Sequence, residues 1–179
     1  TNQANYGGAA EFSTSPCHAI VERCTVRNNS GDDMAGGGGG GGFKIAGIAD
    51  VKIENTVFYR NKAIEDGGAI MVVNATTSIR NCTIVENDAS NGRALHGDTA
   101  AVTIYNSILY TADGDGSEIS DSSDSVTIDF CIVRGGFAGA GAGSQISTAD
   151  PQFVDVLNDN FELDEGSPAI DQADIETAL

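Results

Sequence analysis

The sequence predicts an all-β solenoid, in which one small unit of strands repeats along the chain and stacks upon itself. Three observations predict it: a nine-residue block that recurs, glycine-opened segments that keep step with it, and an alternation within the block that is typical of strands. Copies of the block begin at Val21, Ile53, Ile79, Ile104 and Ile128. Their spacing settles at about 25 residues, which lies in the range of repeat proteins.

Within the block, bulky apolar residues and small residues alternate at period two, which predicts a strand with one buried face. The first position is always β-branched and apolar, and the sixth is always apolar: Val26, Phe58, Ile84, Leu109 and Val133. The third position of the middle copies holds Asn55, Asn81 and Asn106. Because asparagine tolerates the left-handed backbone of a tight bend, we expect a corner between two short strands there.

The glycine series consists of Gly8, Gly42, Gly68, Gly92 and Gly116. Each glycine opens a short segment, such as GAIMV or GRALH. One period is therefore expected to hold a glycine-opened strand, a loop and a bent pair of strands. Since neighbouring strands lie about 4.8 Å apart, the periods would stack into a stub of five to six coils.

These segments, with GGAI at Gly67 and NCTIVEN at Asn81, resemble the right-handed parallel β-helix (pectin-lyase-like) repeats of bacterial secreted and cell-surface proteins. ADPQFVD from Ala149 and FELDEGSPAID from Phe161 are similar to the tail that closes the β-helix in many such proteins. The resemblance implies β-helix repeats over residues 1–149 and a C-terminal tail over residues 150–179 that packs on them or closes them. It also implies a secreted, extracellular location, with display on the cell surface as the further option.

The charge of the chain is uneven. Residues 1–93 hold 8 basic and 10 acidic side chains, a net of −2, and residues 94–179 hold 1 basic and 16 acidic side chains, a net of −15; the two add to the −17 of the whole sequence. We expect neither nucleic acid nor an anionic membrane as a partner, since both attract basic surfaces. No run of 18 apolar residues is present that would predict a membrane span.

An acidic loop, DGDGSEISDSSD, runs from Asp113 to Asp124. Carboxylate oxygens suit Ca²⁺, and the candidate ligands are Asp113, Asp115, Asp121 and Asp124. The loop is not an EF-hand, because Glu118 stands where that loop needs glycine for its sharp turn. Ca²⁺ is the only cofactor that the sequence suggests, and the alternative is a solvated acidic surface.

Residues that point outward from the block form an apolar and aromatic face where a polar one is expected. Its members are Val57, Tyr59, Val85, Ile108, Tyr110 and Ile132. Exposed apolar patches usually mark a contact, so we interpret this face as a binding surface. Three occupants are open: the tail from Pro151 to Asp171, which carries Phe153 and Phe161, a second subunit, or a stacked sugar.

The cysteines are expected to be free thiols. Cys24, Cys82 and Cys131 share one column of the block but lie two coils apart, about 9.6 Å, which is beyond the reach of a disulfide. We therefore expect three buried thiols that act as small apolar residues.

Catalytic residues are not evident. A lyase for acidic polysaccharides needs a base beside a cation or arginine that neutralises the substrate carboxylate, and no two basic residues share an outward column on neighbouring coils. Glu54 should lie beneath Arg80, as a neighbouring-strand ion pair. Isolated histidines at positions 18 and 96 support no triad.

The sequence thus favours a secreted or surface-displayed structural or adhesive protein without catalysis. We expect it to self-associate through its ends or its apolar face, because no capping helix precedes the first strand and open stack ends expose unpaired backbone. The alternative is a carbohydrate-active β-helix. That protein would be a remnant of a polysaccharide lyase or a module that binds surface polysaccharide with the help of Ca²⁺.

Overall fold

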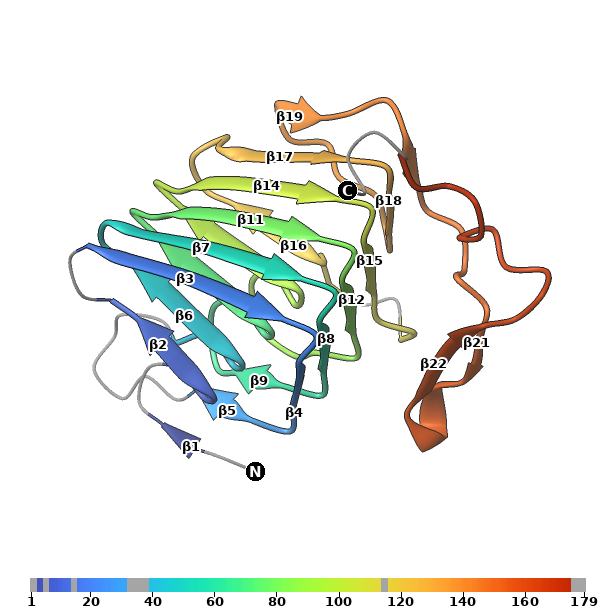
Figure 1. Ribbon diagram of the computed structural model, residues 1–179, viewed down its shortest axis with the longest axis horizontal. Helices are drawn as coiled ribbons and strands as arrows, with labels where there is room; N and C mark the ends of the chain where they lie inside the picture. The colour runs from blue at the N-terminus through green and yellow to red at the C-terminus, as the bar shows by residue number, and fades with distance from the viewer. Residues whose placement is uncertain (1–2, 5–6, 14–15, 32–38, 114–115, 175–179) are drawn as a thin grey trace.

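The computed structural model describes residues 3–4, 7–13, 16–31, 39–113 and 116–174. Figure 1 shows short strands stacked into a parallel β-helix, with a small hairpin standing beside the stack. Strands of one coil pair with the equivalent strands of the next, always in parallel. No α-helix occurs among these residues, so the protein is all-β, as the sequence predicts.

Three sheets run along the stack. The first contains β2 (Ala10–Phe12), β6 (Phe43–Ala46), β10 (Ile70–Val73), β13 (Leu95–Asp98) and β16 (Ile119–Asp121). The second contains β3 (Cys17–Glu22), β7 (Ala49–Glu54), β11 (Thr76–Arg80), β14 (Ala101–Tyr105), β17 (Val126–Asp129) and β19 (Gly141–Ala142). The third contains β4 (Thr25–Arg27), β8 (Val57–Tyr59), β12 (Thr83–Val85), β15 (Ile108–Tyr110), β18 (Cys131–Val133) and β20 (Ile146–Ser147).

Two smaller sheets complete the fold. Three two-residue strands pair near the N-terminal end of the stack: β1 (Gln3–Ala4), β5 (Ser30–Gly31) and β9 (Lys62–Ala63). The tail forms an antiparallel hairpin of β21 (Phe153–Asp155) and β22 (Asn160–Leu163), joined by the 3-10 turn η1 (Val156–Asn158). Across the described residues, no helix is long and apolar enough to cross a membrane.

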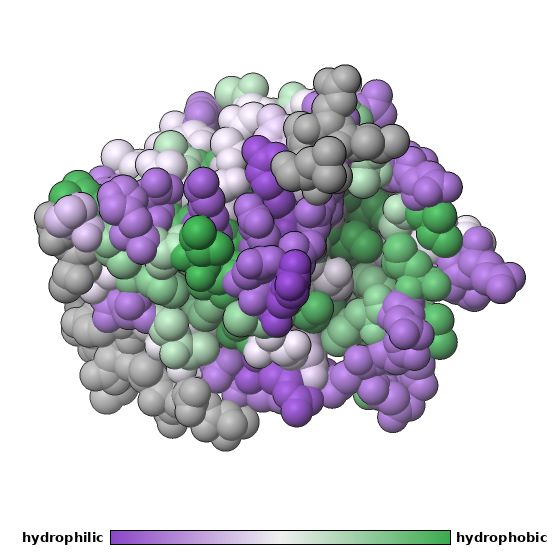
Figure 2. Space-filling view, viewed as in Figure 1, coloured by the Kyte–Doolittle hydropathy of each residue, from purple (hydrophilic) through white to green (hydrophobic). Residues whose placement is uncertain are grey.

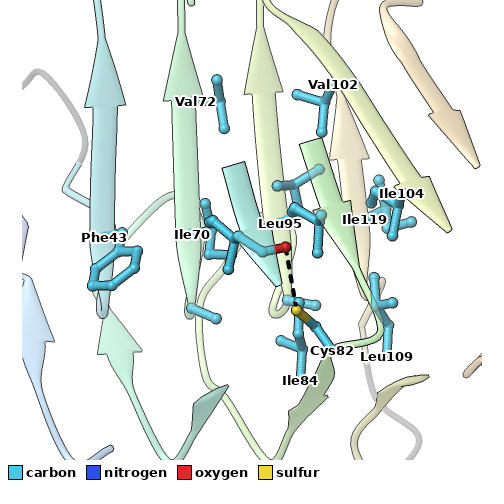
Figure 3. Packing of buried hydrophobic residues seen from close by; sticks show 14 of the residues in the cluster. Phe43, Ile70, Val72, Cys82, Ile84, Leu95, Val102, Ile104, Leu109 and Ile119 are labelled. Carbon is cyan, nitrogen blue, oxygen red and sulfur yellow. Dashed lines mark hydrogen bonds between the residues drawn. The ribbon is translucent and has the colours of Figure 1, made fainter. Parts of the chain in front are cut away.

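The core consists of apolar columns that run through successive coils. The first position of the block forms one such column, because Ile53, Ile79, Ile104 and Ile128 pair in register and none of them is exposed. Figure 3 shows further columns side by side, including Phe43, Ile70, Leu95 and Ile119 of the first sheet. Repetition of one apolar position at the period of the coil therefore builds a continuous core.

The corner predicted between the second and third sheets is confirmed. Asn55, Asn81 and Asn106 have φ of 49°, 52° and 50°, and Arg23 and Phe130 occupy the same corner with φ of 52°. Each of these residues lies between the end of one strand and the start of the next. Asparagine is favoured here because its short polar side chain tolerates the left-handed region.

The glycine series needs a correction of register. Phe43 pairs in register with Ile70, and Ile70 is followed in the same column by Leu95 and Ile119. The glycines three residues before these positions are Gly40, Gly67, Gly92 and Gly116. Gly40 and Gly67 therefore take the places that the sequence analysis gave to Gly42 and Gly68. A side chain at Gly67 would collide with the carbonyl group of Ile70, and the φ of Gly67 is +66°. The apolar column fixes the register, whereas neighbouring glycines can substitute for one another in a sequence alignment.

All four cysteines are free, and Cys82 and Cys131 are buried as expected. Figure 3 shows the Cys82 thiol hydrogen-bonded to a backbone carbonyl, that of Ile53. Burial raises the pKa of the Cys82 thiol to about 11 and that of the Cys131 thiol to about 12. The expectation of a third buried thiol is wrong, because Cys24 is exposed. It belongs to the first coil, where β4 is the last strand of its sheet and no described strand covers it.

Candidate functional site

The predicted binding face lies on the third sheet, under the tail. Tyr59, Val85 and Tyr110 are only 4, 1 and 6 % exposed and form one cluster, against which Val57, Ile108, Phe153 and Phe161 pack. The Phe161 ring lies 5.0 Å from the Tyr59 ring and 5.7 Å from the Phe153 ring, between centroids. Figure 2 shows apolar residues gathered where the tail meets the stack. Of the three occupants considered for this face, the tail is the one observed.

A polar clamp holds the hairpin of the tail on the face. Asp159 forms an ion pair of 2.6 Å with Arg60 and a longer one of 3.5 Å with Arg27. The Tyr59 hydroxyl donates to Asp159 at 3.2 Å and accepts from Arg27 at 2.6 Å. Arg60 also donates to the carbonyl groups of Val156 and Leu157, both at 3.2 Å. One carboxylate of the tail is thus bound by two coils of the stack.

Neutralising Asp159 is expected to loosen the tail. Asp159→Asn keeps a residue that tolerates the φ of 62° at this position but removes the charge that attracts Arg27 and Arg60. A partly buried ion pair with hydrogen bonds contributes more than an exposed one, so we expect the amides of β22 to exchange with deuterium roughly tenfold faster. Glu162→Gln is the matched control, since it removes the same charge from an exposed position of β22. Equal exchange in both variants would contradict a role for the clamp.

At the later coils of the same sheet, the tail and the stack border an open pocket of about 340 Å³. Ile108 and Ile132 of the predicted face line it, together with the corner residues Asn81, Asn106 and Phe130. The tail lines the opposite wall with Leu163, Ala169, Gln172 and Ala173. The remaining lining residues are Cys82, Thr83, Ser107, Cys131, Ser144, Gln145, Ile146 and Ser147. This volume lies in the range of sites that hold small ligands or short peptide segments. The predicted face is therefore divided into a part buried by the hairpin and a part that opens onto a pocket.

The predicted calcium ligands do not gather in the described residues. Asp113 forms an ion pair with Arg93, and the hydrogen bond that its carboxylate accepts from Arg93 raises the pKa of that guanidinium. Asp115 lies outside the described residues. Asp124 is exposed, on a backbone with φ of 53°. No group of three or more histidine, cysteine, aspartate or glutamate side chains is placed to hold a metal ion there.

Asp121 has a structural role in the same loop. Its carboxylate accepts hydrogen bonds from the backbone of Ser123 at 3.3 Å, Ser125 at 3.1 Å and Val126 at 2.9 Å. Burial alone would raise the pKa of Asp121, but these hydrogen bonds outweigh it and lower the pKa. The carboxylate closes the turn into β17, so its oxygens are already used by the chain.

Three of the basic residues on the stack are held by acidic side chains. Arg60 binds Asp159, Lys62 binds Asp88 at 2.6 Å, and Arg93 binds Asp113. Arg80 lies in register with Glu54, which confirms their predicted positions on neighbouring strands. The guanidinium of Arg80 lies 5.4 Å from the centre of the Tyr105 ring, and the ion pair with Glu54 stays a prediction. Arg60, Lys62 or Arg93 would first have to leave its acidic partner before it could neutralise a substrate carboxylate.

Sequence reasoning missed a ladder of buried asparagines at the end of the third sheet. Asn29 donates to the carboxamide oxygen of Asn61 at 2.9 Å, and Asn61 donates to that of Asn87 at 3.0 Å. All three residues are buried. They occupy the ninth position of the first three copies of the block, so the signal was present in the sequence as a column of its own.

A buried carboxylate was also missed. Glu118 is 3 % exposed and precedes β16 beside Thr111, Arg93 and Glu86. Burial raises its pKa to about 7; hydrogen bonds from Thr111 and the charge of Arg93 oppose this shift, and the charge of Glu86 adds to it. Its column in the earlier coils holds Gly42, Ala69 and Ala94, so a small apolar residue is the rule at this position.

The stacked parallel sheets, the columns of repeated core residues and the clamped tail define a parallel β-helix repeat protein. A family model described as a right-handed beta helix region matches residues 2–161, and the chain belongs to this family. Comparisons with curated proteins and with solved structures find no match.

Proposed function

We propose that this β-helix is a secreted or surface-displayed structural or adhesive module that associates end to end with further copies of itself. The observation that carries the proposal is the low burial of the inward-facing residues in the first coil. Inward-facing residues of β3 and of the corner that follows it are less buried than their partners in the next coil: Cys17, Ala19 and Val21 are half-buried and Cys24 is exposed. Their partners Ala49, Val51, Ile53 and Thr56 are 0 to 2 % exposed.

The backbone of the same coil is also open. In the described part of the chain, β2, β3 and β4 are the last strands of their sheets, and no strand pairs with their outer edges. Open strand edges together with apolar side chains favour the addition of further strands. A second copy of the chain offers strands of the same repeat at the same spacing, so it can continue all three sheets at once. Such a contact is heterologous and can extend into a filament.

The apolar face supports self-association less well than the end does. Most of that face is covered by Phe153 and Phe161 of the tail, and uncovering it would cost the contacts of the Asp159 clamp. The carbohydrate-active alternative requires either a free pair of basic residues or a calcium loop. The basic residues at 60, 62 and 93 are held in ion pairs, so this alternative has weaker support than end-to-end stacking.

The proposal predicts that a charge on the end of the stack blocks association. Val21→Glu places a carboxylate on the inward side of β3, whereas Ile20→Glu places the same charge on its outward side, where Ile20 is 70 % exposed. We expect the wild-type chain and Ile20→Glu to show a mass that grows with protein concentration in light scattering after size exclusion, and Val21→Glu to stay monomeric. Circular dichroism of both variants checks that they remain folded.

A second test leaves the core sequence unchanged. Coupling a bulky polar maleimide to the exposed Cys24 should cap the same end and abolish association. A wild-type chain that is monomeric at every concentration would overturn the proposal, as would an undiminished association of the labelled chain.

A further inference from the structure

The pocket between the tail and the stack already contains one example of peptide recognition. The carboxamide of Asn106 accepts a hydrogen bond from the backbone N–H of Asp174 at 3.0 Å and donates to the backbone carbonyl of the same residue at 3.3 Å. The side chain thus binds one residue of an extended segment through both of its backbone groups, as a neighbouring strand would. This kind of contact reads the backbone and does not depend on the side chain of the bound residue.

Asn81 repeats Asn106 one coil earlier. The two residues have nearly the same backbone, with φ of 52° and 50°, and both line the pocket. Within the part of the chain that the structure describes, the carboxamide of Asn81 has no hydrogen-bond partner, and its residue is only half-buried. Asn81 therefore presents to the pocket the group that Asn106 uses to hold the tail.

The rest of the pocket selects for an uncharged, partly apolar ligand. None of the described residues that line it carries a charge. Ile108, Ile132 and Leu163 supply apolar surface, and Gln145 and Gln172 supply further amide groups. A charged side chain of the ligand would lose its hydration here without gaining a partner, which is costly.

We propose that this pocket binds an extended, uncharged peptide segment from another protein, with Asn81 holding one residue of it through its backbone N–H and carbonyl, as Asn106 holds Asp174. A segment crossing the corner at the level of Asn81 would lie about 4.8 Å from the tail segment at Asp174, which is the spacing of neighbouring strands. The site is separate from the open end of the stack, so the binding of a peptide here goes beyond the self-association proposed above. A saccharide is the competing class, because amides and apolar residues also suit its hydroxyl groups and rings. The hydrogen bonds of Asn106 to the backbone of Asp174 favour the peptide over the saccharide.

The test is a titration followed by NMR of the ¹⁵N-labelled chain. The probes are an N-acetylated, C-amidated peptide of alternating alanine and valine, and a neutral trisaccharide, cellotriose. We expect the peptide to shift the side-chain amide signals of Asn81 and to leave those of Asn55 in place, since Asn55 does not line the pocket. Shifts at Asn81 with cellotriose alone, or with neither probe, would overturn the proposal.

Matched variants remove the carboxamide without straining the backbone. Asn81→Gly and Asn55→Gly both suit a left-handed residue, with φ of 52° and 49°, so both should fold. We expect Asn81→Gly to weaken peptide binding about tenfold, because two hydrogen bonds are lost, and Asn55→Gly to bind like the wild type. Equal binding by the two variants would show that Asn81 does not hold the peptide and would refute the proposed contact.

Discussion

Replacing Asn61 by alanine should destabilise the protein more than any change at an exposed asparagine. Asn61 is completely buried, and its carboxamide bonds to both neighbours in the ladder and to the Val26 carbonyl at 2.9 Å. Alanine would leave the backbone and carboxamide N–H groups of Asn29 without the oxygen that they share, and each such buried group costs about 1–3 kcal/mol. It would also remove one donor from the Val26 carbonyl and one from the Asn87 carboxamide, which keeps its bond from the backbone N–H of residue 61. We expect the free energy of unfolding to fall by about 4 kcal/mol, a large part of the stability of a domain of this size.

Urea denaturation followed by circular dichroism measures this effect. Asn91→Ala is the control, since Asn91 is exposed and its carboxamide makes one hydrogen bond, to Asp66 at 2.9 Å. That change should cost less than about 1 kcal/mol. Asn61→Asp adds a test of mechanism, because an aspartate of similar shape should be most harmful above its pKa, where it is charged and cannot donate. A loss below about 1 kcal/mol in Asn61→Ala would mean that the ladder adds little to the fold.

The parts of this fold that sequence reasoning predicted are those that repeat. The column of Ile53, Ile79, Ile104 and Ile128 and the corner at Asn55 recur at the period of the coil, so each copy supports the interpretation of the others. An apolar residue that returns every coil has only one place to go in a stack, the core.

What sequence reasoning missed concerns the departures from the repeat and the ends of the stack. Cys24 occupies a core column, but its coil is not covered on one side, and no feature of its own block indicates that. An alignment on the glycines hides the column in which Glu118 follows Gly42, Ala69 and Ala94, because the apolar residues and not the glycines set the register. Aligned correctly, the sequence alone marks Glu118 as a carboxylate at a position reserved for small residues.

The sequence predicts which residues make up the candidate site, but it does not decide which segment or ligand covers them. Five of the six outward residues form a contact surface under the tail, and the sixth, Ile132, lines the pocket. The sequence favours the tail as the occupant but leaves a second subunit and a sugar open as alternatives. The choice depends on long-range contacts of single residues, such as Asp159 with Arg60 and Asp174 with Asn106. Contacts of this kind occur once in the chain, so no repeat reveals them.

Glu118 should make the protein less stable as pH rises. Its pKa in the folded state is about 7, above its ordinary value of 4.5, because burial disfavours the charged form. The folded state therefore binds the proton more tightly than the unfolded state does, and this contribution to stability is complete below about pH 4.5 and is lost as pH rises through about 7. The shift corresponds to roughly 3 kcal/mol. Arg93 and Glu86 are the charged groups that act on this carboxylate, with opposite signs.

Glu118→Gln removes the titration while keeping the shape of the side chain, so it is expected to approach or exceed the wild type in stability as pH rises. We expect the difference in unfolding free energy between variant and wild type, measured in urea, to shift in favour of the variant by roughly 3 kcal/mol between pH 4 and pH 8. Glu65→Gln is the matched control, because it removes one carboxylate from an exposed position. Because the comparison is made within each pH, other titrating groups cancel, and a difference that stays constant from pH 4 to pH 8 would show that the Glu118 carboxylate is not perturbed by the fold.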